Sequence, residues 1–189
     1  MESGNSLIKC LKLGGVAVIP TDTLYGIVGQ ALNRKTVERI KKIKVRPENK
    51  PFIVLVSSVR DLKKLKIDLN LKEKEILKRF WPGPVSIILS CRDKKFSYLS
   101  KNGKIAVRWP KNKSLENIIK ETGPLVAPSA NPSETSPAKT IAEAKKHFAS
   151  KIDFYSKSKK HLDGPPSTII SIENGKFKVL REGKIKRLK

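Results

Sequence analysis

Short apolar stretches recur along the chain, each bounded by proline, glycine or polar residues. Runs of this length with such boundaries are typical of buried strands. They predict strands at 16–20, 51–56, 85–89, 104–110 and 125–128, and a hairpin over 167–180. Asn174-Gly175 lies within that hairpin, and this dipeptide favours the positive φ angles of a two-residue turn.

Other apolar positions recur every three or four residues, which is the spacing of an amphipathic helix. They predict helices around 7–11, at 33–44, from 58, at 70–81, around 115–119 and from 140. Asn33 is a suitable N-cap, and Thr140 with Glu143 matches a capping box. Gly14-Gly15, Pro47 and Gly123-Pro124 would end three of the helices.

Strands and helices alternate without an obvious repeat or linker, which predicts one α/β domain with a mixed sheet over residues 1–189. A chain of 189 residues can bury a hydrophobic core without disulfides or metals. Residues 183–189 are mostly basic, and we expect them to form a loose tail.

The composition adds a strong positive charge. With 41 Lys and Arg against 17 Asp and Glu, the formal net charge is +24. Such a field attracts polyanions and suits RNA or a phosphate-rich small substrate, although lysine can also simply cover a solvated surface. The distribution is more informative, because eight of the 18 residues from 33 to 50 are basic and two are acidic.

Several classes of protein are disfavoured. The longest clear apolar run, 52–56, is far too short to cross a bilayer, and the N-terminus lacks the pattern of a secretory signal. Cys10 and Cys91, with His147 and His161, show no metal-ligand spacing. We therefore expect a cytoplasmic protein with buried cysteines and no metal site made by the protein itself.

Three bases, Lys44, Arg46 and Lys50, occupy the junction between a predicted helix and a predicted strand. At about 100° per residue, Lys44 falls within the apolar stripe of its own helix. Burying an unpaired ammonium is costly, so Lys44 either meets an anion or extends past the helix end to solvent. Arg46 and Lys50 flank Pro47 and can reach the same anion.

Small polar side chains follow two predicted strands. "APSANPSETSP" (127–137) offers Ser129, Asn131 and Ser136 where open α/β sheets bind phosphate or ribose, but it is also typical of an ordinary Ser/Pro turn. "PTDTLYG" (20–26) places short hydrogen-bonding groups beside a leucine and a tyrosine, which suits a small polar ligand with a methyl group. Alternatively, Asp22 closes an Asx turn and binds nothing.

The chain offers no convincing Ser/His/Asp or Cys/His set and no clear pair of carboxylates. A reaction at these loops would therefore rely on positioning and positive charge, as phosphoryl and nucleotidyl transfers do.

Taken together, these segments resemble the YrdC-like family of threonylcarbamoyl-AMP synthases over about 14–183. The matching stretches occur in family order: "IPTDTLYG", "KVRP", "FWPGPVSIIL", "IAVRWP", "APSAN", "STII" and "LREG". "PTDTLYG" followed by K-x-R and later by S-x-N is specific to this family. The resemblance implies a twisted α/β domain with a large, positively charged concave face.

The resemblance also implies an enzyme that converts L-threonine, bicarbonate and ATP to threonylcarbamoyl-AMP and pyrophosphate. Downstream transferases would use this product to modify the tRNA adenosine beside the anticodon. A carbamate made from threonine and bicarbonate would attack the α-phosphorus, so no protein nucleophile is required. Mg²⁺ would be carried on the phosphates.

On this similarity, site residues can be assigned by position. The K-x-R and S-x-N signature, expected to carry catalysis, is Lys44, Arg46, Ser129 and Asn131. Positions around ATP match Arg46, Lys50, Ala127, Ser129, Ser136 and Arg181. Positions around threonine match Thr23, Arg108 and Ser167.

The chain departs from the family pattern at Leu55, where some members carry histidine. The loop "PSETSP" after Asn131 lacks a common glycine and is one residue short, and "DGPPSTII" before Ser167 is also shortened. After "LREG" only a basic tail follows, so the chain resembles the short form that lacks an extra C-terminal domain.

Two other functions remain open. The basic concavity could serve a non-catalytic double-stranded RNA or tRNA binder, which would not need the threonine set. A related carbamoyl-adenylating enzyme of metallocentre maturation uses carbamoyl phosphate, but it carries this domain in a much longer chain with zinc-finger and acylphosphatase parts.

Overall fold

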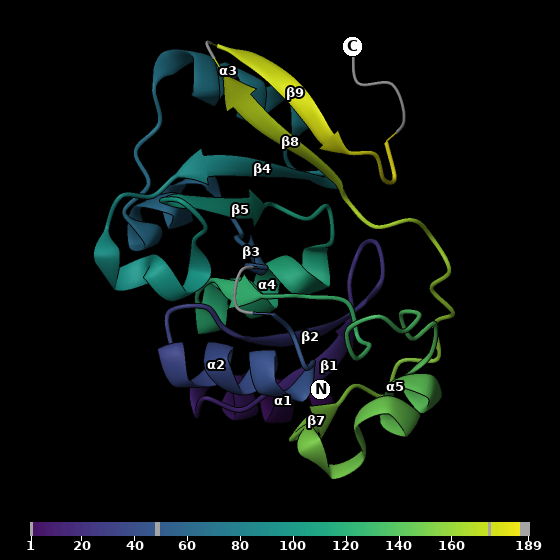
Figure 1. The fold of residues 1–189 in the computed structure, drawn as a ribbon. Coiled ribbons are helices and arrows are strands. Elements are labelled where there is room, and N and C mark those ends of the chain that lie inside the picture. The colour runs from purple at the N-terminus through teal and green to yellow at the C-terminus, as the bar shows by residue number, and fades with distance from the viewer. Residues whose placement is uncertain (1, 48–49, 174, 186–189) are drawn as a thin grey trace.

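The computed structural model describes residues 2–47, 50–173 and 175–185, which form a twisted sheet with helices on both faces (Figure 1). The strands in this part are β1 (Ala17–Pro20), β2 (Tyr25–Gln30), β3 (Ile53–Leu55), β4 (Val85–Ser90), β5 (Lys104–Arg108), β6 (Leu125–Val126), β7 (Phe154–Tyr155), β8 (Thr168–Glu173) and β9 (Lys176–Arg181). The α-helices are α1 (Glu2–Lys12), α2 (Arg34–Ile43), α3 (Leu71–Phe80), α4 (Lys113–Thr122) and α5 (Ile141–Phe148). Short 3₁₀ helices cover Val59–Leu65 (η1), Lys94–Leu99 (η2) and Ala149–Lys151 (η3).

The strands form one sheet in the order β7-β1-β2-β6-β3-β5-β4-β8-β9. The pairs β1–β7, β3–β5 and β4–β8 are parallel, and the other pairs are antiparallel. The predicted α/β domain with a mixed sheet is therefore confirmed. None of the helices in the described ranges is long and apolar enough to traverse a lipid bilayer.

Each face of the sheet has its own core, because neighbouring strand residues point to opposite faces. In β1, Val18 packs in a large cluster with residues of α2, α3 and α5, whereas Ile19 packs in a smaller one with residues of α1 and α4. In β3, Val54 and Leu55 divide between the clusters in the same way. Burial on both faces explains why these strands appear as continuous apolar runs rather than alternating ones.

One central strand was not predicted. Tyr25–Gln30, with the sequence YGIVGQ, is not among the strands expected from the sequence, and its two glycines are unfavourable in a strand. A Cβ at Gly29 would lie 2.5 Å from Thr36 Cγ2, so glycine here allows α2 to approach the strand closely. This packing between distant elements outweighs the local preference.

Two predicted helix starts also differ from the structure. The helix from Ser58 is the 3₁₀ segment η1, and the Ser58 side chain makes no capping hydrogen bond. Thr140 accepts a hydrogen bond from the Glu143 N–H, but the Glu143 carboxylate accepts from the Lys139 N–H, so the capping box is incomplete. The complete box in the described chain is at Asn70 of α3.

The end of the described chain is held in place. The Lys184 N–H donates to Pro166 O at 2.8 Å, and the Ile185 N–H donates to Thr168 Oγ1 at 3.2 Å. A loose tail was expected from residue 183, but 183–185 have these contacts, and 186–189 lie outside the described residues. In the hairpin β8–β9, Gly175 has φ 74°, whereas Asn174 also lies outside the described residues.

Candidate active site

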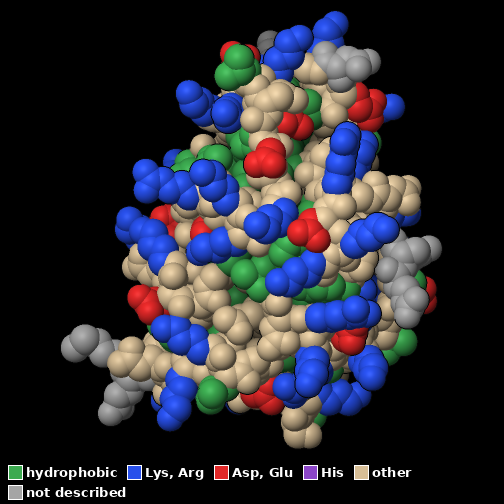
Figure 2. Space-filling view, turned by 90° about the vertical axis from the view of Figure 1, so that its left-hand side faces the viewer, with side chains coloured by type: hydrophobic (Ala, Val, Ile, Leu, Met, Phe, Trp, Pro, Cys, Tyr) green, Lys and Arg blue, Asp and Glu red, His purple; other side chains and the backbone are tan. Residues whose placement is uncertain are grey.

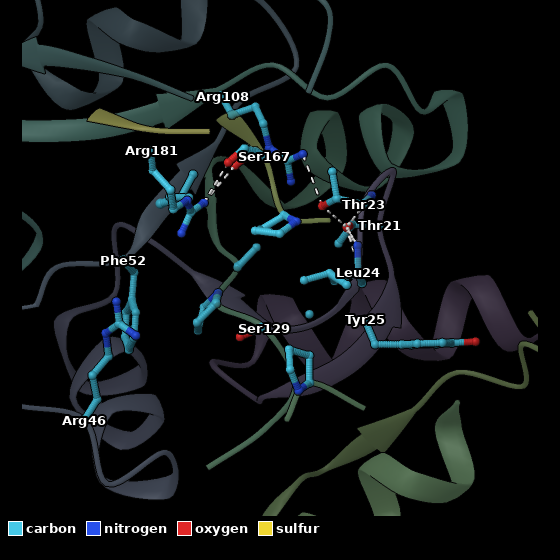
Figure 3. Close-up of a pocket in the computed structure, with 16 residues that line it drawn as sticks. Thr21, Thr23, Leu24, Tyr25, Arg46, Phe52, Arg108, Ser129, Ser167 and Arg181 are labelled. Atoms are coloured by element: carbon cyan, nitrogen blue, oxygen red, sulfur yellow. Dashed lines mark hydrogen bonds between the residues drawn. The ribbon is translucent and has the colours of Figure 1, made fainter. Parts of the chain in front are cut away.

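A cavity of about 230 Å³ opens where the β1–β2 turn, the end of β5 and the segments after β6 and before β8 meet (Figure 3). Since β6 and β3 lie between β2 and β5 in the sheet, the turn reaches across these strands to the cavity. The three residues expected around threonine, Thr23, Arg108 and Ser167, all line the cavity, as do Ala127 and Arg181.

A second hollow of about 300 Å³ adjoins this cavity. Its walls include Lys44, Arg46, Lys50, Ser129 and Asn131, so the K-x-R and S-x-N segments meet here although they are about 85 residues apart. Arg46 and Ser129 line both hollows and mark where they join. The arrangement is a small pocket that leads into a cationic recess.

Lys44 follows the end of α2 and is 1% exposed. Its Nζ donates to the carbonyl oxygen of Ser129 at 2.6 Å and to that of Asn131. Burial, and secondarily the charge of Arg46, lowers the pKa of Lys44 to about 7. The alternative that Lys44 extends to solvent is therefore wrong. It points inward, and its partners in the described chain are neutral carbonyls.

Arg46 lies on the ring of Phe52, with its guanidinium carbon 5.0 Å from the ring centroid. Its Nε donates to Lys50 O at 2.8 Å and its Nη2 to Pro51 O at 3.1 Å. Burial, followed by the charge of Arg181, lowers the pKa of Arg46. Lys50 is exposed at the rim. Among the described residues these close cations have no carboxylate partner, which favours an anionic ligand that would offset their repulsion.

The S-x-N loop is ordered by its own side chains. Ser129 Oγ donates to Asn131 Oδ1 at 2.6 Å, and Asn131 Nδ2 donates to Pro132 O at 2.8 Å and Thr135 O at 2.6 Å. These bonds fix the two carbonyl groups that accept from Lys44, so the wall of the recess is preorganised.

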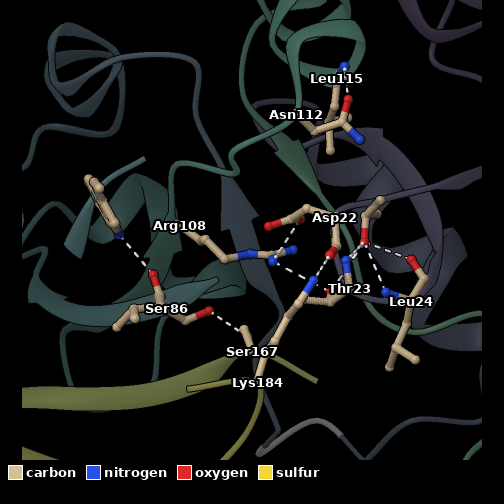
Figure 4. A network of polar contacts seen from close by, with 12 residues as sticks. Asp22, Thr23, Leu24, Ser86, Arg108, Asn112, Leu115, Ser167 and Lys184 are labelled. Carbon is tan, nitrogen blue, oxygen red and sulfur yellow. Dashed lines mark hydrogen bonds and ion pairs between the residues drawn. The ribbon is translucent and has the colours of Figure 1, made fainter. Parts of the chain in front are cut away.

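The β1–β2 turn is closed by a threonine. Thr21 Oγ1 donates to Leu24 O at 2.7 Å and accepts from the N–H groups of Thr23 and Leu24, both at 3.2 Å. The alternative that Asp22 closes an Asx turn is wrong. Asp22 Oδ1 instead forms an ion pair with Arg108 Nη1 at 2.8 Å, seen in Figure 4. Burial lowers the pKa of Arg108, and Asp22 acts in the opposite direction.

Ser167 is held from two sides. Its Oγ lies 2.9 Å from the Oγ of Ser86 on β4, and Arg181 Nη2 donates to its carbonyl oxygen at 2.8 Å. Sequence reasoning missed both Ser86 and the role of Asp22. A signal for Ser86 existed, since it is a single polar residue in the apolar run VSIIL and is fully buried.

Two of the noted positions are not brought to the site. Ser136, expected near ATP, is exposed and lines neither hollow. Leu55 is fully buried in the smaller core cluster and also lines neither hollow. Within the described ranges, no group of three or more His, Cys, Asp or Glu side chains could hold a metal ion.

Comparison with known proteins identifies the family. The model of the Sua5/YciO/YrdC family, described as "Telomere recombination", matches residues 9–183. The chain belongs to this family. A Methanocaldococcus jannaschii member named "Putative threonylcarbamoyl-AMP synthase" is 36% identical over 91% of this chain and 81% of its own length. The Bacillus subtilis "Threonylcarbamoyl-AMP synthase" is 34% identical over 93% of this chain, which spans only 51% of that relative.

Solved structures of the Sua5/YciO/YrdC family have the same fold. P. abyssi Sua5 in complex with L-threonine matches with a TM-score of 0.84 and 27% identity over 95% of this chain and 54% of that one. E. coli YciO matches with a TM-score of 0.83 and 22% identity over 96% of this chain and 89% of that one. The resemblance deduced from the motifs is thus confirmed at the level of family and fold.

Proposed function

We propose that this family member is a nucleotidyltransferase that makes threonylcarbamoyl-AMP and pyrophosphate from L-threonine, bicarbonate and ATP. The observation that carries the proposal is the junction of the two hollows at Arg46 and Ser129. A pocket sized for an amino acid opens there into a cationic recess suited to a triphosphate. The names of the sequence relatives and the threonine complex of P. abyssi Sua5 support the same function.

Threonine occupies the smaller cavity in this proposal. The guanidinium of Arg108 receives its carboxylate, and the hydroxyl groups of Thr23 and Ser167 are available to its other polar atoms. Leu24 supplies apolar wall for the methyl group. The pocket would therefore discriminate against serine, which lacks that methyl, by about 1 kcal/mol.

ATP occupies the recess, with its phosphates along Lys44, Arg46 and Lys50. Ala127, Ser129 and Arg181 line the adjoining cavity and complete the proposed nucleotide contacts. Burial lowers the pKa values of Lys44 and Arg46, and the neighbouring charges of Arg46 and Arg181, respectively, add to this effect. A bound anion would offset both the desolvation and the repulsion. We leave Ser136 outside this set because it reaches neither hollow.

The reaction needs positioning rather than a protein nucleophile. Threonine's amine and bicarbonate form a carbamate with loss of water, and a carbamate oxygen then attacks the α-phosphorus. The bond from this phosphorus to the bridging oxygen breaks and pyrophosphate leaves. The cations of the K-x-R segment balance the negative charge on the phosphates as this bond breaks.

Mg²⁺ enters with ATP in this proposal, bound to phosphate oxygens, since the described residues include no cluster of metal-ligating side chains. It would supply further neutralisation of phosphate charge.

We extend the proposal to partners. The product would pass, in the cytoplasm, to transferases that modify tRNA beside the anticodon. Lys and Arg side chains are spread over the whole of the face in Figure 2 rather than gathered in one stripe. This distribution supports diffuse, salt-sensitive contact with tRNA more than a dedicated groove.

The test is incubation with ATP, Mg²⁺, bicarbonate and labelled threonine, followed by mass spectrometry for the adenylate and a pyrophosphate assay. We expect product and pyrophosphate only when both threonine and bicarbonate are present. Equal cleavage of ATP without either co-substrate would refute the assignment. Tight, salt-sensitive RNA binding without any threonine-dependent thermal shift would instead favour a non-catalytic RNA-binding module.

A further inference from the structure

The ion pair between Asp22 and Arg108 joins two parts of the proposed threonine pocket. Asp22 lies in the β1–β2 turn and Arg108 ends β5, and their side chains are 9% and 4% exposed. The distance of 2.8 Å is that of an ion pair, but no N–H points directly at the carboxylate, so neither Asp22 oxygen has a hydrogen bond within the described chain. Removing one partner of an ion pair this deeply buried is costly, because the other charge is left without compensation.

The turn that carries Asp22 is fixed independently of this pair. The hydroxyl of Thr21 closes the turn, and Lys184 Nζ donates to the carbonyl oxygen of Asp22 at 2.9 Å (Figure 4). Gly183 allows the C-terminal segment to pass close to the backbone of 166–168, because a Cβ there would lie 2.3 Å from Pro166 O. Asp22 is therefore held by the turn and by the C-terminal segment, and it can in turn hold Arg108.

The nitrogen atoms of the Arg108 guanidinium differ in their contacts. Nη1 contacts Asp22 and donates to Thr23 Oγ1 at 3.5 Å. Nε is buried without a hydrogen-bond partner among the described residues, and the contacts of this guanidinium to Asp22 and Thr23 are both made by Nη1 rather than Nη2. Nε–H and Nη2–H form one edge of the guanidinium, and this edge matches the two oxygens of a carboxylate. A buried donor without an acceptor costs free energy, which a ligand carboxylate would recover.

We infer that Asp22 is a positioning residue for recognition of the amino acid. By engaging Nη1, it leaves the Nε–Nη2 edge of Arg108 to receive the substrate carboxylate with two hydrogen bonds. Asp22 acts through Arg108 and does not itself line the cavity. The inference rests on the proposed function and adds to it the residue that sets how the substrate carboxylate is received.

The inference predicts a selective effect on threonine. In Asp22→Asn the shape is retained but the charge that orients Arg108 is lost, and we expect the KM for threonine to rise about tenfold. The KM for ATP and kcat at saturating threonine should stay within about twofold. Glu121→Gln is the matched control, because it removes a carboxylate from the exposed pair with Lys12 and changes the net charge equally. It should leave both KM values unchanged.

A double-mutant cycle separates positioning from a general structural role. In an Arg108→Lys background, which has no planar fork, Asp22→Asn should change the threonine KM less than about twofold. Additive effects, or a parallel rise in the ATP KM, would overturn the inference. A wild-type protein that makes no threonylcarbamoyl-AMP would refute the proposed function itself, whereas an active wild type with unchanged threonine KM in Asp22→Asn refutes only the role of Asp22.

A structure of the wild-type protein with threonine provides the test if Asp22 variants do not fold. We expect the ligand carboxylate on Nε and Nη2 of Arg108, with Asp22 still on Nη1. A carboxylate bound to Nη1, or Asp22 displaced from Arg108, would contradict the inference.

Discussion

Replacing Lys44 with methionine is expected to change the pH dependence of stability. The pKa of Lys44 is about 7 in the folded protein and 10.5 as its reference value. Because the folded-state pKa is lower, the unfolded chain binds more protons between about pH 7 and pH 10.5. The free energy of unfolding of the wild type therefore rises with pH across this window.

The magnitude follows from the two pKa values. Their difference corresponds to about 5 kcal/mol at low pH, where Lys44 is charged in both states. Between pH 6 and pH 9 about 2–3 kcal/mol of this penalty is relieved. Methionine cannot titrate, so the variant lacks this rise. The variant also leaves the carbonyls of Ser129 and Asn131 without their donor, which adds a cost of about 1–3 kcal/mol that does not depend on pH.

The assay is urea denaturation of both proteins at pH 6, 7.5 and 9 and one ionic strength. We expect the wild type to gain about 2–3 kcal/mol relative to Lys44→Met between the two extremes. Lys42→Met, at an exposed lysine of the same helix, is the control and should follow the wild type. Parallel curves for wild type and Lys44→Met would refute the reasoning. Synthesis of the adenylate should also fall in the Met variant, because methionine retains the apolar stem but not the charge.

Substitutions at four further positions test other parts of the structure. Arg46→Ala should cost about 1.5–3 kcal/mol of ATP binding or transition-state stabilisation. Arg46→Lys should recover only part of this loss, because the planar fork is absent. An unchanged kcat/KM in the alanine variant would exclude the proposed contact. Arg108→Ala should abolish the thermal shift caused by threonine while ATP still binds, and a retained shift would place threonine elsewhere. Gly183→Ala should lower stability by about 1–3 kcal/mol in thermal melts, since its Cβ would meet the backbone of 166–168, and an unchanged Tm would contradict this close packing. Ser136→Ala should leave the ATP KM unchanged, whereas a clear rise would return this exposed residue to the nucleotide site.

Local features of the sequence were sufficient for the elements that depend on neighbouring residues. Asn33 caps α2 by accepting a hydrogen bond from the Thr36 N–H, as its position before an apolar-periodic run predicts. The strands buried on both faces were recognised because each one is a continuous apolar run. The motifs also identified the correct family, because the order of motifs along the chain can be recognised without knowing how they are arranged in space.

Only the tertiary structure decided which distant residues meet. The strand at 25–30 pairs with β1 and β6, and its Gly29 lets α2 pack closely against it, a contact that no local preference encodes. The inward direction of Lys44 could be deduced from helical spacing, but its acceptors, 85 and 87 residues away, could not. Asp22 and Arg108 are likewise joined only because the β1–β2 turn reaches across two strands of the sheet. A sequence pattern reports whether a side chain is buried, whereas the order and twist of the strands determine what it is buried against.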